Sequence, residues 1–255
     1  MAPMDNDPTI WTALVTALLA LAGTLLTAVL ASRDRRDLET LKDDLQSRRE
    51  QKVAAASAEQ VLARYRDPLL HAAYDLQSRC WTIVRLGFLD RYLQQGTPQE
   101  QRYAVENTVF LLAQYLGWTE LIRQEVQFLD LGNKDRTRAL LTLQDHIYFI
   151  LQADRGAFST RLRVFAGDQR AIGELMIVRP AGQTPRCLGY AAFLLKRPRQ
   201  LDPWLNPLRG DLAALAAGPL DITRLVALQR GLVDLLDFLD PGSVRFPAVK
   251  RQRLP

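Results

Sequence analysis

The stretch VENTVFLLAQYL at residues 105–116 decides the fold class, because its apolar residues recur three and four positions apart. Val105, Val109, Leu112 and Leu116 would share one face of an α-helix, a spacing typical of a helix that buries one side. Two further sets have this spacing: Leu69, Ala73, Leu76 and Cys80, and Leu140, Leu143, Ile147 and Ile150. No long stretch alternates polar and apolar residues, although residues 175–178 could form a short strand. The sequence therefore predicts an all-α helical bundle.

Capping and turn residues separate these patterns. Asp67 before Pro68 predicts a helix start, and residues 96–98 (Gly-Thr-Pro) with Glu100 predict a helix stop followed by a capping box. Further signals lie at Gly132–Asn133, Asp202–Pro203 and Asp221.

Toward the N-terminus, residues 10–31 run for 22 positions without a charge. As a helix of about 1.5 Å per residue they would cover about 33 Å, enough for a hydrocarbon core of about 30 Å. We therefore expect one transmembrane helix over residues 10–32. The alternatives are a cleaved signal peptide, which would normally begin with basic residues, and a buried soluble helix.

The charges around this segment predict its orientation. No Lys or Arg precedes it, whereas six follow it: Arg33, Arg35, Arg36, Lys42, Arg48 and Arg49. Because basic flanks stay on the cytoplasmic side, residues 1–9 should form a short extracytoplasmic leader and the body should be cytoplasmic. Residues 33–66 carry nine basic and seven acidic side chains without Gly or Pro, which predicts a charged helical stalk.

Small residues recur every fourth position in the expected span, at Thr16, Ala20, Thr24 and Ala28. Such a stripe lets two membrane helices approach closely, so it predicts self-association into a homo-oligomer. The alternative is that the stripe only reflects an Ala-rich composition.

The remaining chain divides by composition into three parts, which are predicted to be a long-helix bundle at residues 67–153, shorter helices packed on it at 154–240, and a basic tail at 241–255. With 48% hydrophobic residues the chain can bury a core, which excludes disorder throughout. The Pro-interrupted tail is expected to be frayed.

Catalytic and cofactor motifs are absent from the sequence. It contains no Walker loop, no Gly-rich dinucleotide fingerprint, no nucleophile elbow and no paired metal-binding cysteines, so no cofactor is expected. One weak metal candidate combines His71, Asp75, Asp145 and His146, which could meet if their helices packed antiparallel. Ordinary hydrogen-bonded histidines are the commoner alternative.

Polar residues also interrupt the apolar helices and could surround a ligand: Asp75, Gln77, Arg79, Glu106, Gln114, Glu120 and Arg123. Solvated helix faces are the alternative, because such residues are rarely buried.

Residues 154–209 carry ten basic against four acidic side chains, interleaved with aromatic residues. The candidates for binding an anionic ligand are Arg161, Arg163, Arg170, Arg179, Arg186, Lys196, Arg197 and Arg199. Coding bias toward Arg with solvated charges is the alternative.

These features together predict a membrane-anchored cytoplasmic binding protein that acts as a sensor, scaffold or adaptor. The expected partners are the lipid bilayer, a second copy, and anionic lipids or a protein, with nucleic acid disfavoured. An enzyme with an unfamiliar helical active site and an anionic-ligand or nucleic-acid binding module remain alternatives.

Overall fold

The structure is a computed structural model that describes residues 41–53, 56, 64–126, 134–154, 156, 158–218 and 221–255, without the side chains of residues 126, 134 and 196–199. The chain divides into two compact units, Met1–Val53 and Ala54–Pro255. In the first unit, residues 41–53 form an exposed helix. The second unit contains the helical body.

Helices account for most of the body, as the sequence predicts. They begin with the helix at residues 64–86 and continue through the π-helix η1 (Asp90–Gln94), α2 (Pro98–Val126), α3 (Lys134–Gln152), α4 (Ala166–Met176), α5 (Tyr190–Gln200), α6 (Asp202–Ala217), α7 (Thr223–Leu239) and the short 3₁₀-helix η2 (Ala248–Lys250). One antiparallel hairpin joins β1 (Ile177–Val178) to β2 (Arg186–Cys187), so the short strand predicted at 175–178 begins two residues later.

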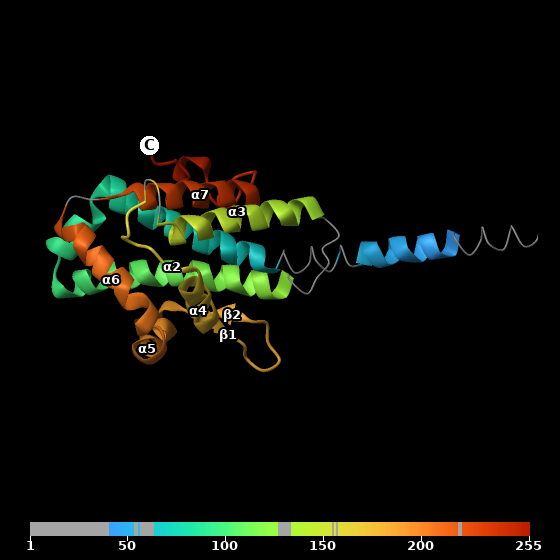
Figure 1. Ribbon diagram of the computed structural model, residues 1–255, viewed down its shortest axis with the longest axis horizontal. Coiled ribbons are helices and arrows are strands. Elements are labelled where there is room, and N and C mark those ends of the chain that lie inside the picture. The colour runs from blue at the N-terminus through green and yellow to red at the C-terminus, as the bar shows by residue number, and fades with distance from the viewer. Residues whose placement is uncertain are drawn as a thin grey trace, which may run out of the picture. The chain divides into compact units, whose positions relative to one another are not determined.

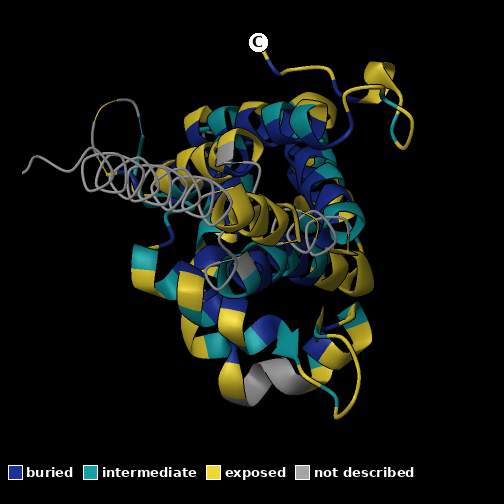
Figure 2. Ribbon diagram, turned by 90° about the vertical axis from the view of Figure 1, so that its right-hand side faces the viewer, coloured by how far each residue is buried: buried dark blue, intermediate teal, exposed yellow. Residues whose placement is uncertain are grey.

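The long helices of the body pack around one apolar core. In Figure 1, α3 and α7 lie side by side, and α4 and the hairpin pack against α2. Figure 2 shows buried residues on the faces that the helices turn toward one another and exposed residues on their outer faces. All three apolar sets predicted from the sequence face inward; Leu69, Val109 and Ile147, for example, are at most 2% exposed.

The corner between the first two long helices of the body contains the capping box that the sequence predicts. Glu100 accepts hydrogen bonds from the Thr97 backbone N–H and hydroxyl, both at 2.8 Å, and α2 begins at Pro98. These bonds lower the pKa of Glu100. Gly87 precedes the corner with a φ of +61°, a conformation that glycine adopts without strain. The chain then passes through η1 before α2 starts.

One boundary differs from the prediction. The backbone is already helical at residues 64–67, so Asp67 does not cap a helix; its carboxylate instead pairs with Arg245 at 2.8 Å. The start predicted at Asp221 is confirmed: α7 begins two residues later at Thr223, whose N–H donates to the Asp221 carboxylate at 3.2 Å. The signal at residues 132–133 lies outside the described residues.

The C-terminal segment is ordered against the body, which corrects the expectation of a frayed tail. Phe246 stacks on Tyr74 with a centroid distance of 3.8 Å, and Leu254 is only 1% exposed. The Leu254 carbonyl accepts a hydrogen bond from Arg230 at 2.8 Å. Residues 241–255 therefore form a strap across α7 and the helix 64–86, and we call this segment the C-terminal strap.

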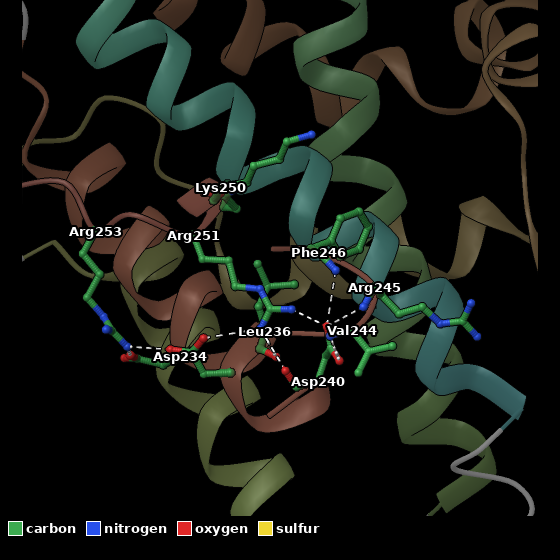
Figure 3. A network of polar contacts seen from close by, with 11 residues as sticks. Asp234, Leu236, Asp240, Val244, Arg245, Phe246, Lys250, Arg251 and Arg253 are labelled. Carbon is green, nitrogen blue, oxygen red and sulfur yellow. Dashed lines mark hydrogen bonds and ion pairs between the residues drawn. The ribbon is translucent and has the colours of Figure 1, made fainter. Parts of the chain in front are cut away.

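A buried ion pair anchors this strap (Figure 3). Asp240 accepts hydrogen bonds from the backbone N–H groups of Val244, Arg245 and Phe246 at 3.0, 3.1 and 3.4 Å, and it pairs with Arg251. Burial alone raises the pKa of Asp240, but these backbone bonds and the Arg251 guanidinium outweigh it and hold the pKa below its usual value.

The predicted span at residues 10–32, with its small-residue stripe, lies outside the described residues. Among the helices that the structure does describe, none combines the length and apolarity needed to cross a bilayer.

Candidate functional site

Three arginine side chains are buried among the described residues. Their hydrogen-bond and ion-pair partners show which of them serve the fold and which one is a candidate for binding a ligand. The first, Arg224 on α7, is 3% exposed and donates to five backbone carbonyls, those of Ile150, Leu151, Ala153, Ser159 and Arg161. Since a guanidinium has five N–H groups, these bonds use its full capacity. Arg224 therefore holds the end of α3 and the following loop, and no donor remains for a ligand.

The second buried arginine, Arg251, belongs to the strap. It pairs with the Asp240 carboxylate and also donates to the backbone carbonyls of Leu236 and Asp240, at 3.3 and 2.9 Å. A carboxylate of the chain thus already compensates its charge.

The third buried arginine, Arg79, has a different environment. It is 9% exposed and donates to Asn107 Oδ1 at 2.7 Å and to Thr108 Oγ1 at 3.2 Å. The Thr108 hydroxyl is oriented for this, because it donates its own proton to the Ala104 carbonyl at 2.6 Å. The guanidinium carbon lies 3.9 Å from the centre of the Phe88 ring, close enough for a cation–π interaction.

The Arg79 side chain opens onto a pocket of about 660 Å³, within the usual range of about 300–1,000 Å³ for small-molecule sites. We call it the Arg79 pocket. Its walls come from the helix 64–86, the segment of η1 and the first half of α2: Asp75, Ser78, Arg79, Thr82, Leu86, Phe88, Arg91, Tyr92, Tyr103, Asn107 and Leu111. A π-helix is rare and often marks a functional site, and η1 supplies Arg91 and Tyr92 to this wall.

The charge of Arg79 is not compensated by a carboxylate of the described chain. Burial lowers its pKa, and the neighbouring Tyr103 hydroxyl opposes that shift, yet arginine stays protonated in proteins. Asp75 lines the same pocket one helical turn away but forms no ion pair with Arg79 within the described part of the chain. Partial burial raises the pKa of Asp75, and the charge on His71 lowers it in part. Arg79 is therefore a buried cation at the pocket wall whose polar partners, Asn107, Thr108 and Tyr103, are all uncharged.

The structure does not bring the four predicted metal ligands together. His71 packs edge-on against Phe246 at 5.0 Å, Asp75 lines the Arg79 pocket, His146 lies beside Gly231 of α7, and Asp145 lines a different cavity. Across the described ranges, no three His, Cys, Asp or Glu side chains could hold one metal ion.

The described side chains of the predicted basic segment lie in separate contacts. Arg163 and Arg179 pair with Asp154 and Glu125 at 3.7 and 3.6 Å. The Arg161 carbonyl accepts a bond from Arg224, Arg170 lines the cavity beside Asp145, and Arg186 is exposed on β2. The side chains of Lys196, Arg197 and Arg199 lie outside the described residues.

The polar residues of the apolar helices are mostly buried, which contradicts the alternative of solvated faces for four of them: Gln77, Arg79, Glu106 and Glu120 are at most 9% exposed. Among the described residues their hydrogen bonds go to different partners. Gln77 accepts a bond from Gln229 at 3.1 Å, and Glu106 binds Arg209 through both oxygens at 3.2 Å. Glu120 pairs with Arg123 at 2.5 Å.

Sequence reasoning found Asp75 and Arg79 but missed their pocket partners. Phe88, Arg91, Tyr92, Tyr103 and Asn107 join the pocket only because the chain reverses at residues 87–97. The helix stop and capping box predicted at residues 96–100 are the available signal, because a helix that stops and restarts there can return along the preceding helix.

Comparisons with protein families, characterised proteins and solved structures give no match for this chain.

Proposed function

We propose that this protein is a membrane-anchored helical binding protein whose body binds a small organic anion in the Arg79 pocket. One observation carries the proposal: Arg79 is a buried cation with no carboxylate partner in the described chain, and it opens onto a pocket of about 660 Å³. An unpaired buried charge is costly, so an anion that pairs with it is bound favourably.

The pocket walls indicate which anions fit. Arg79 and Arg91 supply positive charge, and a planar guanidinium suits carboxylate or phosphate oxygens. Tyr92 and Tyr103 add aromatic surface, which favours a ligand with a flat apolar part. The proposed ligand class is therefore a small carboxylate or phosphate ester.

The test is thermal unfolding of the full chain in detergent against a panel of carboxylates and phosphates that includes benzoate, citrate, inorganic phosphate and adenosine monophosphate. A ligand at about 100 times its Kd stabilises the folded state by about 2.7 kcal/mol. Arg79→Met should abolish this stabilisation, and Arg79→Lys should reduce it, because lysine cannot form paired bonds. The matched control is Arg85→Met, on the same helix but exposed and outside the pocket.

The binding proposal fails if no compound in the panel stabilises the wild type, or if Arg79→Met responds as the wild type does. Turnover of a bound compound that is lost in Asp75→Asn would replace binding by catalysis. Native mass spectrometry of the extracted protein would identify a ligand that co-purifies.

The membrane anchor is supported by the uncharged segment at residues 10–31 and by the basic residues that follow it. A reporter cysteine at residue 135, with Cys80 and Cys187 replaced, should be shielded from an impermeant thiol reagent in intact cells. Labelling without permeabilisation would reverse the proposed orientation.

A further inference from the structure

A second cavity, of about 110 Å³, lies between α2, α3 and α4. We call it the Gln169 cavity. Each of the three helices contributes polar residues to its walls: Glu120, Arg123, Gln144, Asp145, Gln169 and Arg170. It shares no lining residue with the Arg79 pocket.

The orientation of the Gln169 amide is fixed by its neighbours. Gln169 is 2% exposed, and its Nε2 donates to the backbone carbonyls of Tyr148 at 3.1 Å and Val164 at 2.9 Å. Because both partners are acceptors, the amide nitrogen must face them, and Oε1 faces the other way. Within the described chain no donor reaches this buried oxygen. Native proteins rarely leave such an acceptor unmatched.

Gln144, on helix α3, has an unmatched hydrogen-bond donor on the same cavity. It is 5% exposed, and its Nε2 has no acceptor among the described residues. Two side chains on the walls of one cavity therefore require a hydrogen-bond donor and a hydrogen-bond acceptor, respectively.

The charges of the lining are balanced. Both Glu120 oxygens are occupied, by Arg123 at 2.7 and 2.5 Å and by Gln124 at 2.7 Å. Asp145 on α3 and Arg170 on α4 are exposed lining residues, and neither forms an ion pair within the described ranges. A ligand would thus meet one free negative and one free positive charge.

The walls are held in place by a close helix crossing. A Cβ on Gly173 of α4 would lie 2.7 Å from Glu120 Cβ and 2.8 Å from the Leu116 carbonyl oxygen of α2. The two helices are therefore in backbone contact next to the cavity, so the cavity keeps its shape without a ligand.

We propose that the Gln169 cavity binds a small zwitterion of the α-amino acid type. The ammonium group supplies donors for Gln169 Oε1 and a positive charge for Asp145. The carboxylate supplies acceptors for Gln144 Nε2 and a negative charge for Arg170. The cavity, of about 110 Å³, has room for several waters or for one small amino acid such as glycine.

The test uses the full chain in detergent, with saturation-transfer NMR and titration calorimetry against the standard α-amino acids, and acetamide as a neutral probe. We expect binding of a small amino acid, and about tenfold weaker binding in Gln169→Met and in Gln144→Met, the effect of one lost buried hydrogen bond. Asp145→Asn and Arg170→Gln should also weaken it, and because both residues are exposed these variants avoid a folding defect. The matched control is Gln99→Met, an exposed glutamine on α2.

The proposal is overturned if none of the amino acids binds, because the cavity then holds water only. It is also overturned if acetamide binds as tightly as the amino acid, or if the four variants leave binding unchanged. Arg79→Met should leave amino acid binding intact, so failure of the Arg79 pocket and failure of the Gln169 cavity are separate results.

Discussion

Replacing Arg251 with Met tests whether the buried ion pair holds the C-terminal strap in place. The Arg251 and Asp240 side chains are 2% and 4% exposed, so the substitution leaves a buried carboxylate without its counter-ion. Breaking a buried pair in this way costs about 3–5 kcal/mol, a large share of a domain stability of about 5–15 kcal/mol. The three backbone N–H bonds to Asp240 remain, which places the expected loss near the lower limit, at about 3 kcal/mol.

The assay is urea unfolding of the full chain, followed by tryptophan fluorescence. The matched control is Arg253→Met, two residues along the same strap, which pairs with Asp234 at 2.6 Å although these side chains are 52% and 45% exposed. An exposed pair contributes at most about 1 kcal/mol, so this control should unfold nearly as the wild type does. Equal losses for the two variants, or a loss below about 1 kcal/mol for Arg251→Met, would refute the argument from burial.

The same pair predicts an acid dependence of the unfolding free energy. The pKa of Asp240 in the folded state lies below its unfolded value of about 3.9, so its stabilisation is present above that pH and is lost as the pH falls through the folded pKa. Asp240→Asn should remove this part of the acid dependence. Arg224→Lys should lower the unfolding free energy by about 2–4 kcal/mol in urea, because an ammonium cannot reach five carbonyls. Gln144→Met should raise the melting temperature without ligand, by about 1 kcal/mol of stability, because it removes an unmatched buried donor; a lower melting temperature would contradict this. Burial raises the pKa of Cys80 to about 12, so iodoacetamide should label it at pH 8 only after unfolding, as measured by mass spectrometry.

The helical fold could be read from the sequence because its signals are local. The spacing of Leu69, Val109 and Ile147 records which face of each helix meets the core, and the Thr97–Glu100 capping box is contained in four residues. The strap could not be read in this way. Its basic residues suggest a solvated tail, and only the position of Asp240 in the folded body shows that Arg251 has a buried partner.

The candidate sites were predictable only in part, for the same reason. Asp75 and Arg79 attract attention because they interrupt an apolar helix, but whether such an arginine has a carboxylate partner depends on contacts far along the chain. Arg224 shows this: it stands four residues from Leu228 in an apolar helix, yet its five acceptors lie 63 to 74 residues earlier. The unmatched oxygen of Gln169 likewise depends on the fold, because the carbonyls of Tyr148 and Val164 occupy both amide hydrogens and leave the oxygen without a donor.

The strap also has a consequence for the order in which the body matures during synthesis. The helix 64–86 leaves the ribosome early, whereas residues that complete its surroundings come 173 to 178 positions later, as in the bonds from Gln77 to the Lys250 carbonyl and from Arg245 to Asp67. At about 5–20 residues per second, the apolar face around Tyr74 waits roughly ten seconds or more for Phe246 to cover it. A newly made chain therefore passes through an interval in which this face is open to chaperones and to aggregation, and that interval ends when the strap closes.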